Sequence, residues 1–231
     1  MLTNHEHPHP TAERERSLTI DAVPELGLLV VDDHPAVRMG LLQLLDEQPD
    51  LRVVDAVASA ETAISVTERE PIDIAVVDYQ LGSRSGLWLS RMLKRLRRPP
   101  GVVIYSAYCD GPLAAACVVA EADALVGKGG VGADLCDAVR AVARGRSQLP
   151  LVPPAMAGAM RRRLTPEEQA IFGMLLARID PSEVATTLGI ARAGLDIRMW
   201  AMLHKLERLR PDHVGASLGT RRAARRRSLG C

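Results

Sequence analysis

Five polar side chains, Asp32, Asp33, Asp78, Ser106 and Lys128, are of the types that bind a hard cation and a phosphoryl group. Each follows a short apolar run that predicts a buried strand; the runs are 28–31, 72–77, 101–105 and 124–127. In a parallel α/β sheet the carboxyl ends of all strands open on one edge, and ligand sites collect there. We therefore expect these side chains to meet in space although they are far apart in the sequence.

Three carboxylates that crowd together repel one another, and a bound divalent cation relieves that repulsion. Mg²⁺ usually takes one or two carboxylates together with waters and a phosphate, so the expected cofactor is Mg²⁺. Asp78 is then a candidate nucleophile that forms an acyl phosphate. Lys128 would pair with the phosphoryl oxygens, and Ser106 would donate a hydrogen bond to one of them. The alternative is structural: Asp32 and Asp33 cap a helix and Lys128 is a surface charge.

The elements that position these residues alternate between strand and helix five times. Strands are expected at 26–31, 51–58, 72–78, 101–106 and 124–127, and helices at 35–46, 60–70, 85–97, 112–121 and 131–144. Strands separated by helices imply βαβ units, a parallel sheet and helices on both of its faces. The fold class is therefore α/β with a five-stranded parallel sheet, followed by an all-α domain.

The charge distribution supports two domains. Residues 1–160 carry 15 basic and 21 acidic side chains (−6), whereas residues 161–231 carry 14 and 7 (+7). An acidic domain followed by a basic one suits a metal or phosphate module joined to an anion-binding module. The four cysteines form no zinc pattern, and we expect Cys109 to be a small buried residue. The longest apolar run, 113–120, is too short to span a membrane, and a cytoplasmic location is expected.

The expected domain boundaries follow from composition. Residues 1–25 are interpreted as a disordered extension, 26–145 as the α/β domain and 146–160 as a linker whose prolines oppose a helix. Residues 161–222 form the helical domain and 223–231 a basic tail. The first helix of the helical domain begins with a capping box at Thr165 and Glu168, and the second ends at Gly189. A third helix is expected at about 191–209, and a weaker fourth begins at Pro211.

With these motifs in view, residues 26–145 resemble the receiver domain of two-component response regulators of the NarL/LuxR family, which has a flavodoxin-like fold. The segments that carry the resemblance are Val30–Pro35 and Val37–Leu41. The resemblance implies that Asp78 accepts phosphate from a sensor histidine kinase. It also implies Mg²⁺ ligands at Asp33, Asp78 and the Gln80 carbonyl, with Asp32 acting through water, and a switch formed by Ser106 and Lys128.

Two positions depart from that family pattern. Leu125 stands where the family has its switch aromatic residue, and Gly82 stands in place of the usual proline after the Asp78 strand. A side chain without a ring cannot alternate between a buried and an exposed aromatic position. Phosphorylation is therefore expected to be feasible, and its transmission to the second domain is expected to be weaker than in relatives.

Residues 164 to about 222 resemble the LuxR-type helix-turn-helix domain, on Leu164–Glu168, Glu183–Ala185, Leu188–Ile190 and the residues Leu203, Lys205 and Leu206. The departures lie where DNA would be contacted: Gly194, Asp196 and Trp200 replace polar or basic residues of the family. The expected DNA-binding residues are Arg192, Asp196, Ile197, Arg198, Trp200 and Lys205.

The sequence therefore predicts a phosphorylation-dependent response regulator, not an enzyme, that controls transcription by binding DNA and forms a homodimer when phosphorylated. One alternative keeps the phosphate-accepting domain but gives the helical domain a role in protein–protein interaction, with Trp200 as an anchor. Another, a magnesium-dependent phosphohydrolase, lacks a second acid-base carboxylate, because Tyr79 and Gln80 follow Asp78.

Overall fold

The computed structural model describes residues 25–208. Its first domain is a five-stranded parallel sheet in the order β2-β1-β3-β6-β7. The strands are β1 (Leu26–Val31), β2 (Leu51–Val57), β3 (Ile74–Asp78), β6 (Gly101–Ser106) and β7 (Ala124–Gly127). The expected fold class, strand number and parallel pairing are confirmed. The expected N-terminal extension, apart from Glu25, the fourth helix from Pro211 and the basic tail lie outside the described residues.

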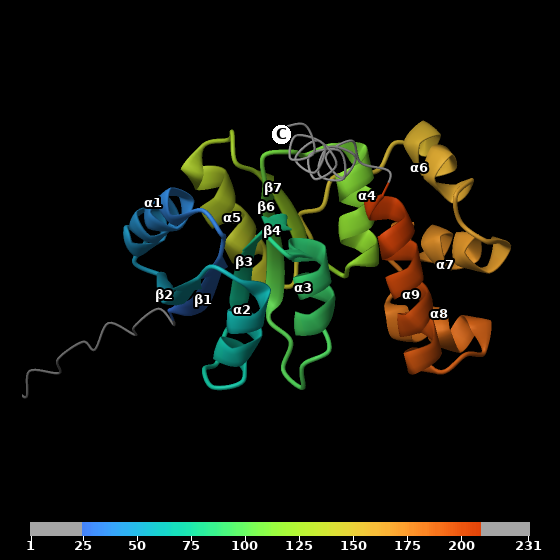
Figure 1. The fold of residues 1–231 in the computed structure, drawn as a ribbon, viewed down its shortest axis with the longest axis horizontal. Helices are drawn as coiled ribbons and strands as arrows, with labels where there is room; N and C mark the ends of the chain where they lie inside the picture. The colour runs from blue at the N-terminus through green and yellow to red at the C-terminus, as the bar shows by residue number, and fades with distance from the viewer. Residues whose placement is uncertain (1–24, 209–231) are drawn as a thin grey trace, which may run out of the picture.

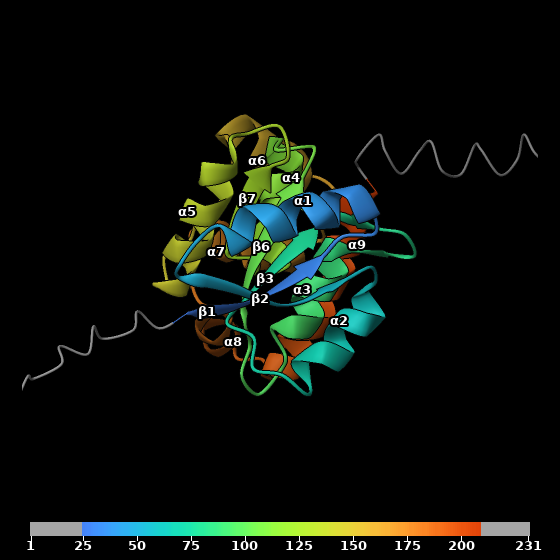
Figure 2. The same ribbon diagram turned by 90° about the vertical axis from the view of Figure 1, so that its left-hand side faces the viewer.

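Helices cover both faces of this sheet (Figure 2). One face carries α1 (Pro35–Asp46) and α5 (Gly132–Ala143); the other carries α2 (Ala60–Thr67), α3 (Gly86–Leu93) and α4 (Gly111–Val119). The division follows the twofold period of a strand. In β1, for example, Leu28 and Val30 pack toward α1 and α5, whereas Leu29 and Val31 pack toward the opposite face.

Two details of this domain differ from the sequence-based expectation. A two-stranded antiparallel hairpin, β4 (Gln80–Leu81) with β5 (Arg84–Ser85), lies between β3 and α3. Strands of two residues show no periodicity, so the sequence pattern cannot reveal them. Helix α3 ends at Leu93 and α2 at Thr67, shorter than the expected ranges 85–97 and 60–70.

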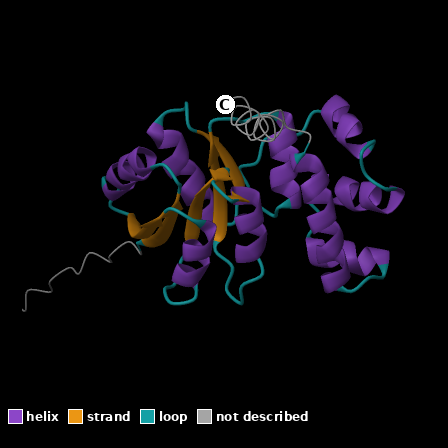
Figure 3. Ribbon diagram, in the orientation of Figure 1, coloured by secondary structure: helices purple, strands orange, loops and turns teal. Residues whose placement is uncertain are grey.

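The second domain contains α6 (Pro154–Arg161), α7 (Pro166–Leu176), α8 (Pro181–Leu188) and α9 (Arg192–Glu207) (Figures 1 and 3). Helix α6 begins within residues 146–160 and ends at Arg161, so the expectation of a linker without a helix is wrong. Its prolines occupy the N-cap (Pro153) and the first helical position (Pro154), where no intrahelical N–H is needed. The capping box of α7 is confirmed, since Thr165 and Glu168 bond reciprocally.

The two domains share one hydrophobic core. Helix α4 lies between the sheet and the helical domain, where it contacts α6, α7 and α9 (Figure 1). All of its residues from Leu113 to Val119 are buried, as expected for a helix that is apolar on every side. The buried cluster that begins in the sheet continues without a break through Phe172 of α7 and Leu206 of α9.

Candidate functional site

Three carboxylate side chains and one imidazole lie close together at the edge of the sheet where the strands end. Ligand atoms of Asp32, Asp33, His34 and Asp78 all lie within 4.8 Å of one another. Asp32 and Asp33 follow β1, and Asp78 is the last residue of β3, so the neighbouring parallel strands β1 and β3 bring them together. Asp32 and Asp78 are buried, whereas the side chain of Asp33 is about one-third exposed. The predicted meeting of these carboxylates is confirmed.

Lys128 closes the cluster from the end of β7. Its Nζ lies 2.6 Å from Asp32 Oδ2 and 3.0 Å from Asp78 Oδ1. Its backbone N–H donates to the carbonyl oxygen of Ser106 at 2.7 Å, which fixes the loop after β7 against the end of β6. Ser106 is buried, and it lies one residue beyond Tyr105, which pairs in register with Asp78. The ammonium therefore bridges two of the three carboxylates.

The electrostatics of the cluster are set by burial. Burial raises the pKa of the Asp78 carboxyl above its ordinary value, although a hydrogen bond from Lys128 acts in the opposite direction. For Lys128, burial acts to lower the pKa, but hydrogen bonds to Asp32 and Asp78 outweigh it, and the pKa of the ammonium is raised. Lys128 is thus charged at neutral pH, and one positive charge faces three carboxyl groups.

Asp33 retains an unused ligand atom. Its Oδ1 lies 2.7 Å from His34 Nδ1 and accepts a hydrogen bond only when that nitrogen carries the proton. Without that proton, this buried oxygen has no hydrogen-bond partner among the described residues. An acidic cluster with one lysine and one unsatisfied carboxylate oxygen fits a divalent cation, because hard cations take oxygen ligands. The residues at this edge of the sheet can therefore hold a metal ion.

The loop after Asp78 completes the rim of the cluster. The backbone N–H of Gln80 donates to the Asp78 carboxylate, and the Gln80 side chain is exposed. Gly82 forms the tip of the β4–β5 hairpin with φ +60°, a conformation that proline cannot adopt. A Cβ at this position would lie 3.9 Å from Asp33 Oδ2. The glycine that replaces the family's proline therefore belongs to a different turn, one that brings the backbone close to Asp33.

Helix α9 turns the expected DNA-binding residues toward the protein itself. Arg192 Nη2 lies 2.9 Å from Glu121 Oε1, and Asp196 Oδ1 lies 2.6 Å from Arg91 Nη2. The ring centroid of Trp200 lies 6.4 Å from that of Trp88 in α3. All three side chains thus face the first domain.

The other basic residues of α9 are paired within the helical domain. Arg198 Nε lies 2.6 Å from Glu167 Oε1, and Lys205 Nζ lies 2.6 Å from both carboxylate oxygens of Glu168. Ile197, with an exposed fraction of 70%, is the expected DNA-binding residue that stays on the free surface. Of the expected DNA-binding residues, Arg192, Asp196 and Trp200 therefore face the first domain, whereas Ile197 lies on the exposed side of α9.

Comparisons with known proteins place these features in a family. Residues 28–140 match the response regulator receiver domain family. The DNA-binding transcriptional activator DevR/DosR of Mycobacterium tuberculosis is 29% identical over 191 residues, which cover 78% of this chain and 87% of that protein. The nitrate/nitrite response regulator protein NarL of Escherichia coli is 24% identical over 191 residues, with 78% and 88% covered. This chain therefore contains a response regulator receiver domain, and over 78% of its length it is similar to DevR/DosR and NarL.

Solved structures agree on the fold. RcsB from Salmonella enterica serovar Typhimurium, bound to a promoter, superposes with a TM-score of 0.53 at 19% identity, covering 79% of this chain and 92% of that one. In this chain a helical region, α6 to α9, follows the receiver domain. Within the part of the chain that the structure describes, no helix is long and apolar enough to cross a membrane.

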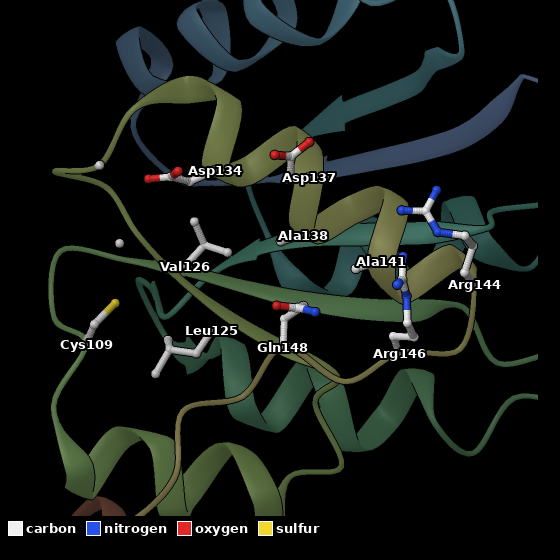
Figure 4. A pocket seen from close by; sticks show the side chains of 12 residues that line it. Cys109, Leu125, Val126, Asp134, Asp137, Ala138, Ala141, Arg144, Arg146 and Gln148 are labelled. Carbon is white, nitrogen blue, oxygen red and sulfur yellow. The ribbon is translucent and has the colours of Figure 1, made fainter.

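The receiver domain has a second recess at the edge strand β7, shown in Figure 4. It measures about 650 Å³, and its lining includes Leu125, Cys109 and Gln148. Gln148 pairs with Ala124 as a single parallel bridge, so the chain that leaves the receiver domain runs along β7. Leu125, at the family's switch position, is buried there. Cys109 is exposed, so the expectation that it is buried is wrong.

Three residues of the site escaped the sequence analysis. Gly86 lies so close to the Asp78 carbonyl that a Cβ would approach its oxygen to 2.2 Å. Arg38 Nη1 donates to the Asp32 carbonyl at 2.6 Å, and His34 joins the acidic cluster. The sequence did contain one indication of the close contact at Gly86. This glycine is the first residue of the helix that follows the strand ending at Asp78. Arg38 and His34 gave no signal beyond their proximity in sequence to Asp33.

Proposed function

We propose that this response regulator accepts a phosphoryl group on Asp78 from a sensor histidine kinase and, in that state, regulates transcription through its helical domain. The observation that carries the proposal is the position of Lys128 Nζ, 2.6 Å from Asp32 and 3.0 Å from Asp78 at the closed end of the acidic cluster. An ammonium at that position neutralises a dianionic phosphoryl group as it forms on Asp78.

The transfer is a displacement at phosphorus. A carboxylate oxygen of Asp78 attacks the phosphorus of the donor phosphohistidine, and a P–O bond forms as the N–P bond breaks. The electron pair leaves with the imidazole nitrogen, which takes a proton from solvent. Lys128 then exchanges its contact with the Asp78 carboxylate for one with a phosphoryl oxygen, and the Ser106 hydroxyl donates a hydrogen bond to another.

The group that completes this site in the proposal is Mg²⁺. Asp33, Asp78 and the Gln80 carbonyl would hold it, with Asp32 acting through water; when bound, it neutralises charge on the phosphoryl oxygens. The unsatisfied oxygen of Asp33 and the excess of carboxylates over ammonium support this assignment. Two carboxylates, those of Asp33 and Asp78, would match the usual preference of Mg²⁺ for few protein ligands.

Phosphate uptake tests the first half of the proposal directly. Incubation with a small phosphodonor such as acetyl phosphate should add one phosphoryl group, detected by intact mass, only when Mg²⁺ is present. Asp78→Asn should take up none, because an amide is not a nucleophile. Equal labelling of wild type and Asp78→Asn would refute the assignment of Asp78.

DNA binding by the helical domain is the proposed output. It is supported by relatives whose names record it, DevR/DosR as a DNA-binding transcriptional activator and RcsB as a promoter-bound protein. We further propose that phosphorylation promotes a homodimer, since paired helix-turn-helix domains bind paired half-sites. Sedimentation with and without a phosphoryl mimic tests the dimer, and titrations against genomic fragments at several salt concentrations test DNA binding.

One observation favours a second candidate function. The side chains of α9 that would face DNA instead contact Arg91 and Trp88 of the receiver domain, which is the behaviour of a protein-binding surface. In this second proposal, α9 recognises protein and the domain contacts no specific base. Absence of DNA binding by the phosphorylated protein, even at low salt where phosphate contacts are strongest, would favour it.

A further inference from the structure

The β4–β5 hairpin lies beside the acidic cluster both at its tip and at the point where it joins α3. At its tip, Gly82 approaches the Asp33 carboxylate, with 3.9 Å between a Cβ position and Oδ2. After the hairpin, the Gly86 N–H donates to the Tyr79 carbonyl at 2.7 Å, and Gly86 packs on the Asp78 carbonyl. A new ligand or a covalent phosphoryl group at Asp33 or Asp78 therefore lies directly beside this hairpin.

The hairpin leads directly to a pair of tryptophans between the domains. Ser85, its last residue, caps α3 by accepting from the Trp88 N–H at 3.1 Å. The Arg84 guanidinium stacks 4.7 Å from the centroid of the Trp88 ring. Trp88 in turn contacts Trp200 of α9, at 6.4 Å between centroids, within the range for interacting aromatic pairs. Ten residues of chain and one ring contact separate Asp78 from α9.

Charged side chains hold the same face of α9 against α3. Arg91 is 1% exposed and forms ion pairs with Glu121, after α4, and with Asp196 of α9. Arg95 lies with its guanidinium 5.2 Å from the centroid of the Trp200 ring. A buried arginine between two carboxylates loses much of its compensation if α9 moves away, unless water replaces it. The docked position of α9 is thus coupled to the position of α3.

A cavity leaves the hairpin room to move. It measures about 640 Å³ and is lined by Asp33, His34, the hairpin and Trp88 on the receiver side and by His204 and Glu207 of α9 on the other. The space therefore extends from the acidic cluster to α9. The family's switch position offers no comparable contact, because Leu125 is buried, carries no ring and lies beside the chain segment at Gln148.

We propose that Trp88, moved by the hairpin 80–85, couples the occupancy of Asp78 to the docking of α9 through Trp200. The inference rests on the proposed phosphorylation of Asp78 and adds the route by which the helical domain senses it. A phosphoryl group on Asp78 needs space beside the segment that Gly86 packs against, so in this proposal phosphorylation shifts the hairpin and loosens the tryptophan contact. Trp88 and Trp200 are positioning residues here, since neither touches the reacting atoms.

Thermodynamic reciprocity supplies the test. If phosphorylation weakens docking, then a change that weakens docking must strengthen binding of a phosphoryl mimic, by up to the full coupling factor. We would titrate full-length protein with beryllofluoride and Mg²⁺ and follow the bound ¹⁹F resonances. Trp200→Ala and Trp88→Ala should each bind the mimic at least about 5-fold more tightly than wild type, the lower end of usual coupling. Trp88→Phe, which keeps a ring, should fall between wild type and Trp88→Ala.

The matched control is Ile197→Ala, which lies on the same helix three residues before Trp200 but on the exposed face. It should bind the mimic as wild type does. Asp196→Asn is a smaller change that keeps the shape of the side chain and removes the charge facing Arg91; it should also tighten binding. This variant keeps the test valid if a tryptophan variant does not fold.

The two tryptophans also report the change directly, because the chain has no others. With Trp200→Phe, emission comes from Trp88 alone, and with Trp88→Phe from Trp200 alone. Both should change on addition of beryllofluoride with Mg²⁺, and Arg84→Gln should reduce the Trp88 response.

The outcomes separate the inference from the proposed function. Wild-type affinity in Trp200→Ala, Trp88→Ala and Asp196→Asn, or weaker binding in them, would overturn the inference while leaving phosphorylation of Asp78 intact. Failure of wild type to bind beryllofluoride would refute the proposed function, and the inference with it.

Discussion

Substituting alanine for Gly86 should damage the phosphoacceptor more than any change of equal size elsewhere in the receiver domain. The added Cβ would lie 2.2 Å from the Asp78 carbonyl oxygen and 3.0 Å from its carbonyl carbon, both backbone atoms that cannot rotate away. Restoring van der Waals contact requires the end of β3 and the start of α3 to separate by about 1 Å. A misplacement of about 1 Å at a reacting group can cost about 100-fold in rate.

Gly86→Ala should also lower the free energy of unfolding by about 1 to 2 kcal/mol, because the overpacking outweighs the helix propensity gained by alanine. We would measure the rate of labelling by acetyl phosphate with Mg²⁺ and, separately, unfolding in urea. Gly40→Ala is the matched control, since Gly40 lies in helix α1 with nothing within 4 Å of the added Cβ. It should leave labelling unchanged and raise stability by about 0.5 to 1 kcal/mol.

A result in which Gly86→Ala labels at the wild-type rate and unfolds at the wild-type urea concentration would refute the reasoning. It would mean that the close approach of α3 to Asp78 plays no part in positioning the carboxylate. Slower labelling with unchanged stability would still support it, because the chemistry depends on smaller displacements than folding does.

Three further perturbations test the stability side of the same structure. Without a divalent cation at pH 7, Asp78→Asn should raise the free energy of unfolding, because it removes a carboxylate whose pKa burial raises; urea unfolding with and without Mg²⁺ checks this. Thr165→Ala should lower stability by about 1 kcal/mol through loss of the capping box, and Thr165→Ser, which keeps the capping oxygen, should not. Arg140→Gln should cost up to about 1 kcal/mol at pH 7, because Arg140 pairs with Asp50 through two contacts of 2.7 Å at a partly exposed site. Arg140 lowers the pKa of Asp50, so the stability that the pair contributes is present above the ordinary value of 3.8 and is lost as pH falls through the lowered pKa. The free energies of unfolding of wild type and Arg140→Gln should therefore converge in acid. A constant difference between them from pH 7 to pH 3 would count against the pair.

The sequence predicted the acidic cluster well because its geometry follows from topology. Once the runs before Asp32, Asp78, Ser106 and Lys128 were assigned to parallel strands, their ends had to share one edge. Helix starts were equally local: the reciprocal bonds of Thr165 and Glu168 depend on four consecutive residues. The rule that excludes proline from helices failed at Pro153 and Pro154 because it applies to helix interiors and not to the first turn.

What the sequence could not predict depends on contacts between distant segments. The β4–β5 hairpin is too short for periodicity, and the close approach of Gly86 to Asp78 depends on how α3 docks. Cys109 follows an apolar strand yet is exposed, since the chain leaves the sheet edge at that point. The ion pair between Arg91 and Asp196 spans 105 positions, and no local pattern of charge or hydropathy indicates which partner a lone aspartate will find.

Two sequence features that were unrelated in isolation have one explanation in the structure. The run Leu113–Ala120 is apolar on every side of a helix, which a receiver helix with a solvent-facing side would not need. Asp196 and Trp200 replace basic or polar residues on the helix expected to contact DNA. In the structure, α4 is covered by α6, α7 and α9, and the same docking of α9 brings Asp196 and Trp200 into contact with Arg91 and Trp88 of α3.

The residues Asp196 and Trp200 of α9 are therefore placed where both DNA contact and docking on the receiver domain would use them. A carboxylate that is unfavourable against phosphates is favourable against Arg91, and the Trp200 ring packs against Trp88 with the two ring planes tilted by 45°. If the docked state were unimportant, neither substitution would have a structural reason, because the helical scaffold is built from Leu195, Met199, Met202, Leu203 and Leu206 without them. It follows that any DNA contact by this face of α9 competes directly with docking on the receiver domain. Measured DNA affinity should then rise in Trp88→Ala, which weakens docking without changing a charge or a residue of the helical domain, and stay unchanged in Gly40→Ala.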